Sequence, residues 1–90
     1  MTTQKTLDII NEKGLHARAS AKFVETVERF DATAQVRRDG LEAGGDSIMG
    51  LLMLAASKGT SIEVETCGSE AHALLDALEA LVADRFGEDF

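Results

Sequence analysis

Residues 61–86, SIEVETCGSEAHALLDALEALVADRF, set the architecture, because they join one half-buried strand to one amphipathic helix. Ile62, Val64 and Thr66 alternate with glutamates, which predicts a strand with one apolar and one solvated face. Ser69 and Glu70 then begin a helix with an apolar stripe at helical spacing. The stripe comprises Leu74, Leu75, Leu78, Leu81, Val82 and Phe86. Two such elements bury their apolar faces against one another, which predicts a layer of helices on a sheet.

The chain before this stretch carries the same two periodicities. Alternation predicts a first strand over 5–10, and a 3.6-residue repeat predicts a helix over 17–30 after a polar loop at 11–14. Two short strands, 34–37 and 41–43, flank Asp39-Gly40, a dipeptide typical of tight hairpins.

A further short helix is expected from residue 48, with Ser47 as its N-cap. Lys58-Gly59 supplies a cation and a left-handed residue that are expected to close it. The positions that can face the core are Ile48, Leu51, Leu52 and Ala55.

The order β-α-β-β-α-β-α predicts an α+β fold of two layers. The expected architecture is an open-faced β-sandwich, in which three helices cover one face of a four-stranded antiparallel sheet. No proline, repeat or linker interrupts residues 1–90, so a single domain is expected.

Composition excludes several classes of function. The formal charge of −7, without tryptophan or tyrosine, disfavours a nucleic-acid partner. The longest apolar run, residues 48–56, is far shorter than the roughly 20 residues that cross a bilayer, so no membrane insertion is expected. The N-terminus does not resemble a signal peptide, and the lone Cys67, expected to be a small apolar filler, cannot form an internal disulfide. These features predict a cytoplasmic protein.

Gly14-Leu15-His16-Ala17-Arg18 places a histidine at the start of the predicted helix over 17–30. Neutral imidazole can attack phosphorus near pH 7, and the product is a dianion. Free backbone N–H groups in the first turn, such as that of Ala17, and the guanidinium of Arg18 suit such a charge. A solvated surface histidine or an improvised helix cap is the plainer alternative for His16.

Three segments together resemble HPr, the phosphocarrier of the bacterial phosphoenolpyruvate-dependent phosphotransferase system, over essentially the whole chain. Residues 14–18 look like its active-site loop, 45–52 (GDSIMGLL) like its regulatory-serine helix, and 58–60 followed by 62–64 like its last strand. The resemblance implies that His16 accepts a phosphoryl group on Nδ1 from phosphorylated enzyme I and passes it to an enzyme IIA-type acceptor. It implies a carrier, not an enzyme, with Arg18 in contact with the phosphate.

Three positions depart from the common family pattern. Ala19 stands where a proline is usual, and Glu25 and Glu28 stand where many members carry lysine, which should weaken steering toward an acidic partner. Residues 30–32 and 51–59 also look similar to carriers of the nitrogen-related regulatory branch of the system.

The resemblance implies a second use for Ser47, phosphorylation by an HPr kinase, which would place negative charge on a contact surface. Met49 and Met53 cannot share one core face with the apolar residues named above for this helix, so part of it is expected to be exposed. The predicted partner-binding residues are Ile48, Met49, Leu52 and Met53, and filling of core gaps is the plainer alternative for the two methionines.

A rival hypothesis is a regulatory module that docks through a helix over residues 48–55 and never turns over phosphate. No cofactor is expected, and neither His72, expected at the surface, nor any other residue predicts a metal site. The acidic Glu88-Asp89 tail is expected to be solvated.

Overall fold

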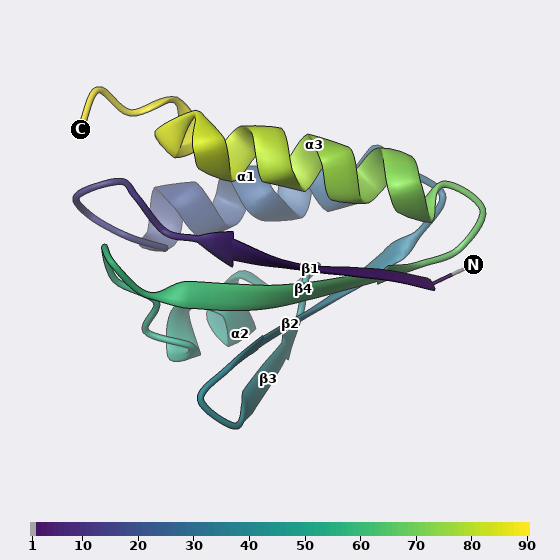
Figure 1. Cartoon of the computed structure of the whole chain (residues 1–90), viewed down its shortest axis with the longest axis horizontal. Helices are drawn as coiled ribbons and strands as arrows, with labels where there is room; N and C mark the ends of the chain where they lie inside the picture. Colours follow the sequence, from purple (N-terminus) through teal and green to yellow (C-terminus); the bar gives the residue numbers. More distant parts are fainter. Residues whose placement is uncertain (1) are drawn as a thin grey trace.

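The computed structural model describes residues 2–90, so Met1 of the expected domain lies outside the described residues. In chain order its elements are β1 (Thr2–Asp8), α1 (Ala17–Glu28), β2 (Thr33–Arg38), β3 (Leu41–Gly44), α2 (Ile48–Met53), β4 (Ser61–Cys67) and α3 (Ala71–Ala83). A 3₁₀ turn, Arg85–Gly87, follows α3. The predicted element order and the α+β class are confirmed (Figure 1).

The strands form one antiparallel sheet in the order β1-β4-β2-β3. Leu7 of β1 pairs with Ile62 of β4, and Val36 of β2 pairs with Val64 of β4. These four side chains are buried, while the residues between them are exposed or only half-buried. Because side chains alternate across a strand, this register gives the sheet one apolar face, on which α1 and α3 lie (Figure 1).

The two predicted helical stripes form the other half of the core. Phe23 and Val27 of α1 and Leu74 and Leu78 of α3 are buried, and α2 adds Leu51. Burial of each such side chain contributes about 1.5–3 kcal/mol. Phe86 is also fully buried, but it lies in the 3₁₀ turn beyond α3 instead of extending that helix.

Two predicted elements have boundaries that are wrong by a few residues. The first strand begins at Thr2 and ends at Asp8, so Ile10 lies outside it and is partly exposed. α1 ends at Glu28, because the N–H groups of Arg29 and Phe30 turn to the carbonyls three residues back.

The prediction for the short helix is corrected more substantially. α2 ends at Met53, and Ala55 adopts a φ of 51°, so Lys58-Gly59 lies in the connection to β4 and does not close the helix. Ile48 is partly exposed and Ala55 is exposed, whereas the residues that join Leu51 in the core are Leu54 and Ala56. Because α2 has only six residues, the helical spacing of apolar residues does not apply to the residues after Met53.

Two expectations for single residues are also wrong. Cys67 is exposed and is not an apolar filler, because strand alternation turns Thr66 inward and Cys67 outward. Glu88 is largely covered, and only Asp89 of the acidic pair is exposed.

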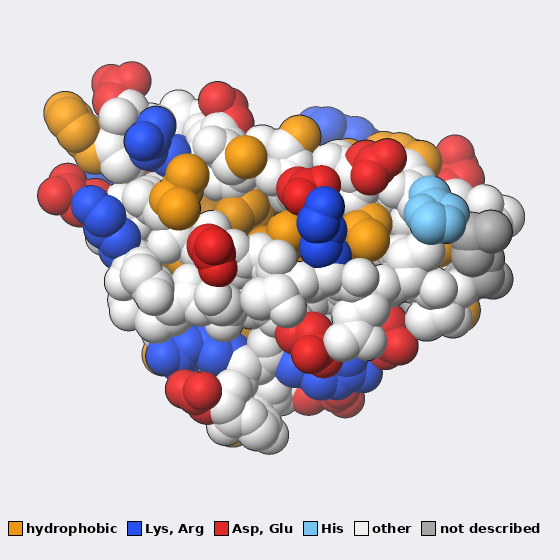
Figure 2. All heavy atoms as spheres, viewed as in Figure 1, with side chains coloured by type: hydrophobic (Ala, Val, Ile, Leu, Met, Phe, Trp, Pro, Cys, Tyr) orange, Lys and Arg blue, Asp and Glu red, His pale blue; other side chains and the backbone are white. Residues whose placement is uncertain are grey.

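The surface has mixed charge. On the face drawn in Figure 2, acidic and basic side chains are interspersed among the described residues. Between residues 2 and 90, no helix combines the length and apolar character needed to cross a membrane.

Candidate functional site

The loop between β1 and α1 is held against the chain that follows α2. Gly14 has a φ of 65°, and a Cβ placed there would lie 2.5 Å from the Ala56 carbonyl oxygen. The N–H of Leu15 donates to that same oxygen over 2.8 Å, and the Leu15 side chain is buried. Glycine at 14 therefore permits the close approach that fixes the residue before His16.

His16 is the N-cap residue of α1, as predicted, with extended backbone geometry. Its side chain makes no capping hydrogen bond, so the interpretation as an improvised cap is wrong. The ring is 26 % exposed, and its Nε2 atom contacts Oε2 of Glu88. The ring is thus accessible but oriented by a specific partner.

The first turn of α1 offers free hydrogen-bond donors beside His16. The first helical bond runs from the N–H of Ser20 to the His16 carbonyl, over 2.8 Å. Among residues 2–90, the N–H groups of Ala17 and Arg18 have no acceptor, as expected for a helix N-terminus. Ala19 is fully buried within this turn.

Two shallow hollows, each of about 300 Å³, meet at this place. His16 and Leu52 line the first, together with the chain after α2, and Arg18 and Glu88 line the second. Lys13 lines both. The structure therefore brings His16, Arg18 and Leu52 to one end of the molecule. The guanidinium of Arg18 is exposed and forms no ion pair within the described chain.

Three residues of this site are not predicted as site residues from the sequence: Asn11, Lys13 and Glu88. Asn11 lies in the predicted polar loop, yet it is fully buried, and its Nδ2 donates to the Gly14 carbonyl (2.8 Å) and to Oε1 of Glu88 (2.9 Å). The Asn11 hydrogen bond, followed by that of His16, holds the pKa of Glu88 below its usual range against the effect of burial. No local pattern in the sequence marks these contacts.

Ser47 is the N-cap of α2, and its Oγ accepts the N–H of Gly50 over 3.0 Å, which confirms the predicted cap. The side chains predicted to bind a partner differ in exposure. Met49 and Met53 are 69 % and 75 % exposed, Ile48 is 39 % exposed, and Leu52 is half-buried.

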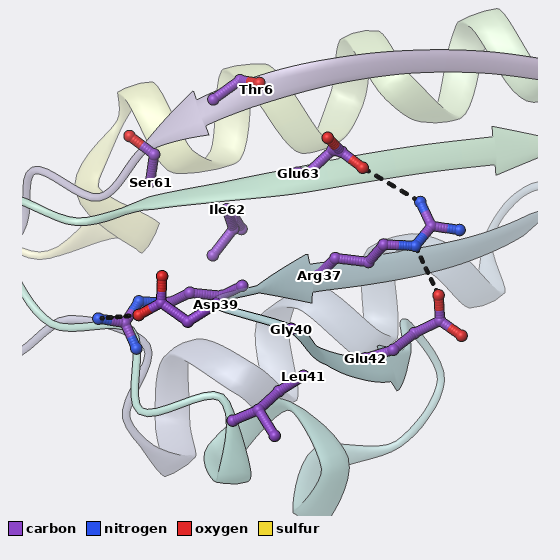
Figure 3. Close-up of a pocket in the computed structure, with 10 residues that line it drawn as sticks. Thr6, Arg37, Asp39, Gly40, Leu41, Glu42, Ser61, Ile62 and Glu63 are labelled. Atoms are coloured by element: carbon purple, nitrogen blue, oxygen red, sulfur yellow. Dashed lines mark hydrogen bonds and ion pairs between the residues drawn. The ribbon is translucent and has the colours of Figure 1, made fainter.

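A larger hollow of about 600 Å³ lies on the open face of the sheet, away from His16 (Figure 3). Two arginines line it: the guanidinium of Arg37 bonds Glu42, Glu63 and Glu65, and that of Arg38 contacts the Asp39 carboxylate. The hydrogen bonds that Arg37 donates to Glu65 and Glu42 raise its pKa. Because carboxylates already pair with both guanidinium groups, the hollow is poorly suited to an anion.

The fold and the site together define a small α+β domain that presents one histidine at a helix N-terminus, in a shallow and open setting. His72, the second histidine, is exposed on α3, as expected. No group of three metal-ligating side chains occurs in residues 2–90.

Comparison with known proteins agrees with this class. The family model described as "PTS HPr component phosphorylation site" matches residues 3–84. "Phosphocarrier protein HPr" of Neisseria meningitidis serogroup A is 46 % identical over 85 residues, 94 % of this chain and 96 % of the relative. "Phosphocarrier protein NPr" of Escherichia coli K12 is 42 % identical over 90 residues, 99 % and 100 % of the two chains.

Solved structures show the same architecture. The crystal structure of HPr-C-His from Thermoanaerobacter tengcongensis superimposes with a TM-score of 0.92 at 33 % identity, over 98 % of this chain and 99 % of that one. The protein therefore belongs to the HPr family, the phosphocarrier proteins of the phosphotransferase system.

Proposed function

We propose that His16 is the residue that carries the phosphoryl group, taken from phosphorylated enzyme I and passed to an enzyme IIA-type acceptor. The observation that carries this proposal is the position of the ring. It is accessible in an open hollow and is the N-cap of a helix whose first N–H groups are free. A nucleophile that must meet several partner proteins needs such an open setting. In this role residues 1–90 act as one cytoplasmic carrier domain, which is covalently modified without being an enzyme.

The N–H groups of Ala17 and Arg18 and the Arg18 guanidinium hold the phosphate. Unpaired donors at a helix N-terminus favour an anion, and a planar guanidinium can bond two of its oxygens. Because Arg18 is exposed and unpaired within residues 2–90, it can reach the phosphate without breaking an existing ion pair.

The partner proteins dock on the exposed part of α2, formed by Ile48, Met49, Leu52 and Met53. Flexible thioether side chains adapt to partners of different shape. Leu52 lines the hollow that contains His16, so a partner on this surface would also cover the ring.

Phosphorylation of Ser47 by an HPr kinase regulates this docking. The Ser47 side chain is half-buried, but the exposed Ile48 and Met49 follow it directly, so a phosphate on Ser47 would stand beside the docking surface. Such a group adds nearly two negative charges next to side chains that would otherwise lose water on binding. Slower phosphorylation of Ser47→Asp than of Ser47→Ala by enzyme I is the expected result.

Intact mass spectrometry after incubation with phosphoenolpyruvate, magnesium and enzyme I tests the acceptor. One acid-labile phosphoryl group is expected on the wild type and on His72→Ala, the matched control, and none on His16→Ala. An adduct on His16→Ala would assign the phosphate to another residue. No adduct on any variant, with an active enzyme I, would favour a docking module that acts through residues 48–55.

Two further measurements test the phosphate contact and the branch of the system. Arg18→Lys should be phosphorylated more slowly than Arg29→Lys, which changes an exposed arginine at the other end of α1.

Glu25 and Glu28 are exposed on α1 and carry charge opposite to that of many family members. Transfer to purified acceptors from the sugar branch and the nitrogen-related branch shows which of them this carrier serves.

A further inference from the structure

The chain after α3 packs against the loop that precedes α1 and contains His16. Figure 1 shows the C-terminus at the same end of the molecule as the connection between β1 and α1. Phe86 is fully buried, its carbonyl accepts from Nζ of Lys22 over 2.6 Å, and the N–H of Glu12 donates to the Phe90 carbonyl over 3.0 Å. The tail, residues 86–90, is therefore anchored on both sides of Glu88.

The backbone before Glu88 has an unusual conformation. Arg85 and Phe86 both adopt a φ of 55°, which side-chain-bearing residues seldom do, and Gly87 follows with a φ of 77°. These three residues leave the helical path of α3, and the chain beyond them places Glu88 against His16. The burial of Phe86 holds this turn in place.

Each oxygen of the Glu88 carboxylate has its own partner. Oε1 accepts from Nδ2 of Asn11 over 2.9 Å, and Oε2 contacts Nε2 of His16. The side chain of Glu88 is only 17 % exposed. Asn11 cannot reverse its amide, because Nδ2 also donates to the Gly14 carbonyl over 2.8 Å. The carboxylate is therefore held from one side and faces the histidine ring with the other.

This contact determines where the proton of neutral His16 lies. An ionised carboxylate only accepts hydrogen bonds, so Nε2 must carry the hydrogen that it receives. Neutral imidazole has one N–H, which leaves the lone pair on Nδ1. The lowered pKa of Glu88, caused first by the Asn11 hydrogen bond, keeps the carboxyl ionised at neutral pH.

We propose that Glu88 is a positioning residue for phosphoryl transfer: it keeps the proton on Nε2, presents Nδ1 to phosphorus, and stabilises the charge that the ring gains. This inference rests on the proposed role of His16. Glu88 lies beyond residues 3–84, the part matched by the family model, so the assignment comes from the contacts and not from the family motif.

The step balances without a proton entering or leaving. The Nδ1 lone pair of His16 forms the bond to phosphorus, while the bond between phosphorus and the donor breaks and its electron pair stays with the donor. The hydrogen stays on Nε2, so the ring becomes cationic, and the Glu88 carboxylate compensates this charge. Transfer to the acceptor reverses these changes. The carboxylate meets the ring at Nε2, the nitrogen that does not bond phosphorus, which limits its repulsion of the phosphate.

Replacement of Glu88 by glutamine gives an unusual prediction. Glutamine has one oxygen, and the fixed amide of Asn11 requires it. The glutamine NH₂ group then faces His16 and favours Nε2 without hydrogen, which moves the proton to Nδ1. Glu88→Ala only removes the contact. We therefore expect phosphorylation rates in the order wild type, Glu88→Ala, Glu88→Gln, with Glu88→Gln about 10- to 100-fold below wild type.

The control is Asp89→Asn, which removes the same charge from the neighbouring exposed residue. Two readouts are measured on each variant: the rate of phosphorylation by phosphorylated enzyme I, and the proton position on His16 from ¹⁵N NMR of the ring. The proposal expects hydrogen on Nε2 in the wild type and in Asp89→Asn, and a shift toward Nδ1 in Glu88→Gln. If the tail had a purely structural role, Glu88→Ala would be phosphorylated more slowly than Glu88→Gln, because alanine disturbs packing more than glutamine does.

The possible results separate the two proposals. A wild-type rate and an unchanged proton position in Glu88→Gln would overturn the role of Glu88 and leave His16 as the acceptor. A slower rate with an unchanged proton position would also overturn it. A wild type that active enzyme I cannot phosphorylate would overturn the acceptor role itself, and with it any role of Glu88 in transfer.

Discussion

Gly14→Ala tests whether a close backbone approach fixes the loop before His16. An alanine Cβ at this position would lie 2.5 Å from the Ala56 carbonyl oxygen and 2.8 Å from Cα of Ser57, and both are backbone atoms that cannot rotate away. The same substitution at Gly59, where φ is also positive at 89°, meets nothing within 4 Å. Gly59→Ala therefore places a side chain at positive φ, as Gly14→Ala does, but its Cβ does not clash with the backbone.

The difference between the two variants isolates the steric effect. A side chain at positive φ costs about 1–2 kcal/mol, and this cost applies to both positions. Forcing an extra methyl group into packed structure costs about 1–3 kcal/mol, and weakening the hydrogen bond from Leu15 to Ala56 costs about 0.5–1.5 kcal/mol. Gly14→Ala should therefore lose about 2–4 kcal/mol more than Gly59→Ala, a large part of the roughly 5–15 kcal/mol of a typical domain.

Urea denaturation followed by far-UV circular dichroism measures this difference, since the chain has no tryptophan or tyrosine for fluorescence. With a slope of about 1 kcal/mol per molar urea, the midpoint of Gly14→Ala should lie about 2 M or more below that of Gly59→Ala. Equal midpoints would refute the reasoning, because they would mean that the loop relaxes without cost.

Three further outcomes are expected. Ser47→Ala should lower the free energy of unfolding by about 1 kcal/mol, because the N–H of Gly50 loses its cap, whereas Ser47→Asp should retain most of it; equal urea midpoints for the two variants would contradict the cap. Leu51→Ala should cost about 2–5 kcal/mol, while Met49→Ala, at an exposed position of the same helix, should change stability by less than about 0.5 kcal/mol; similar losses would contradict the assigned faces of α2. Glu88 has a lowered pKa in the folded protein, so its stabilising contribution is present above its unfolded value of about 4.3 and is lost as the pH falls through the lower folded value; ¹³C NMR of the carboxyl group measures that pKa, and a normal or raised value would be evidence against the contacts.

The layers and the element order followed from periodicity in the sequence. Alternation over 61–66 and the helical stripe over 74–82 are local patterns, and burial of their apolar faces leaves few arrangements. His16 as the first residue before a helix and Ser47 as a cap also depend on neighbours within four residues. Such features are accessible to sequence reasoning because the interactions that cause them are local.

The end of α2 and the partners of His16 depended on the path of the whole chain. Leu54 and Ala56 enter the core because Ala55 leaves the helical conformation, which apolar spacing alone does not reveal. Glu88 reaches His16 across 72 residues, through the length of α3 and a turn at positive φ. A contact of that kind exists only once the sheet and helices have packed. The sequence alone therefore identified His16 as the candidate site, whereas only the packing of the folded chain placed the Glu88 carboxylate against its ring.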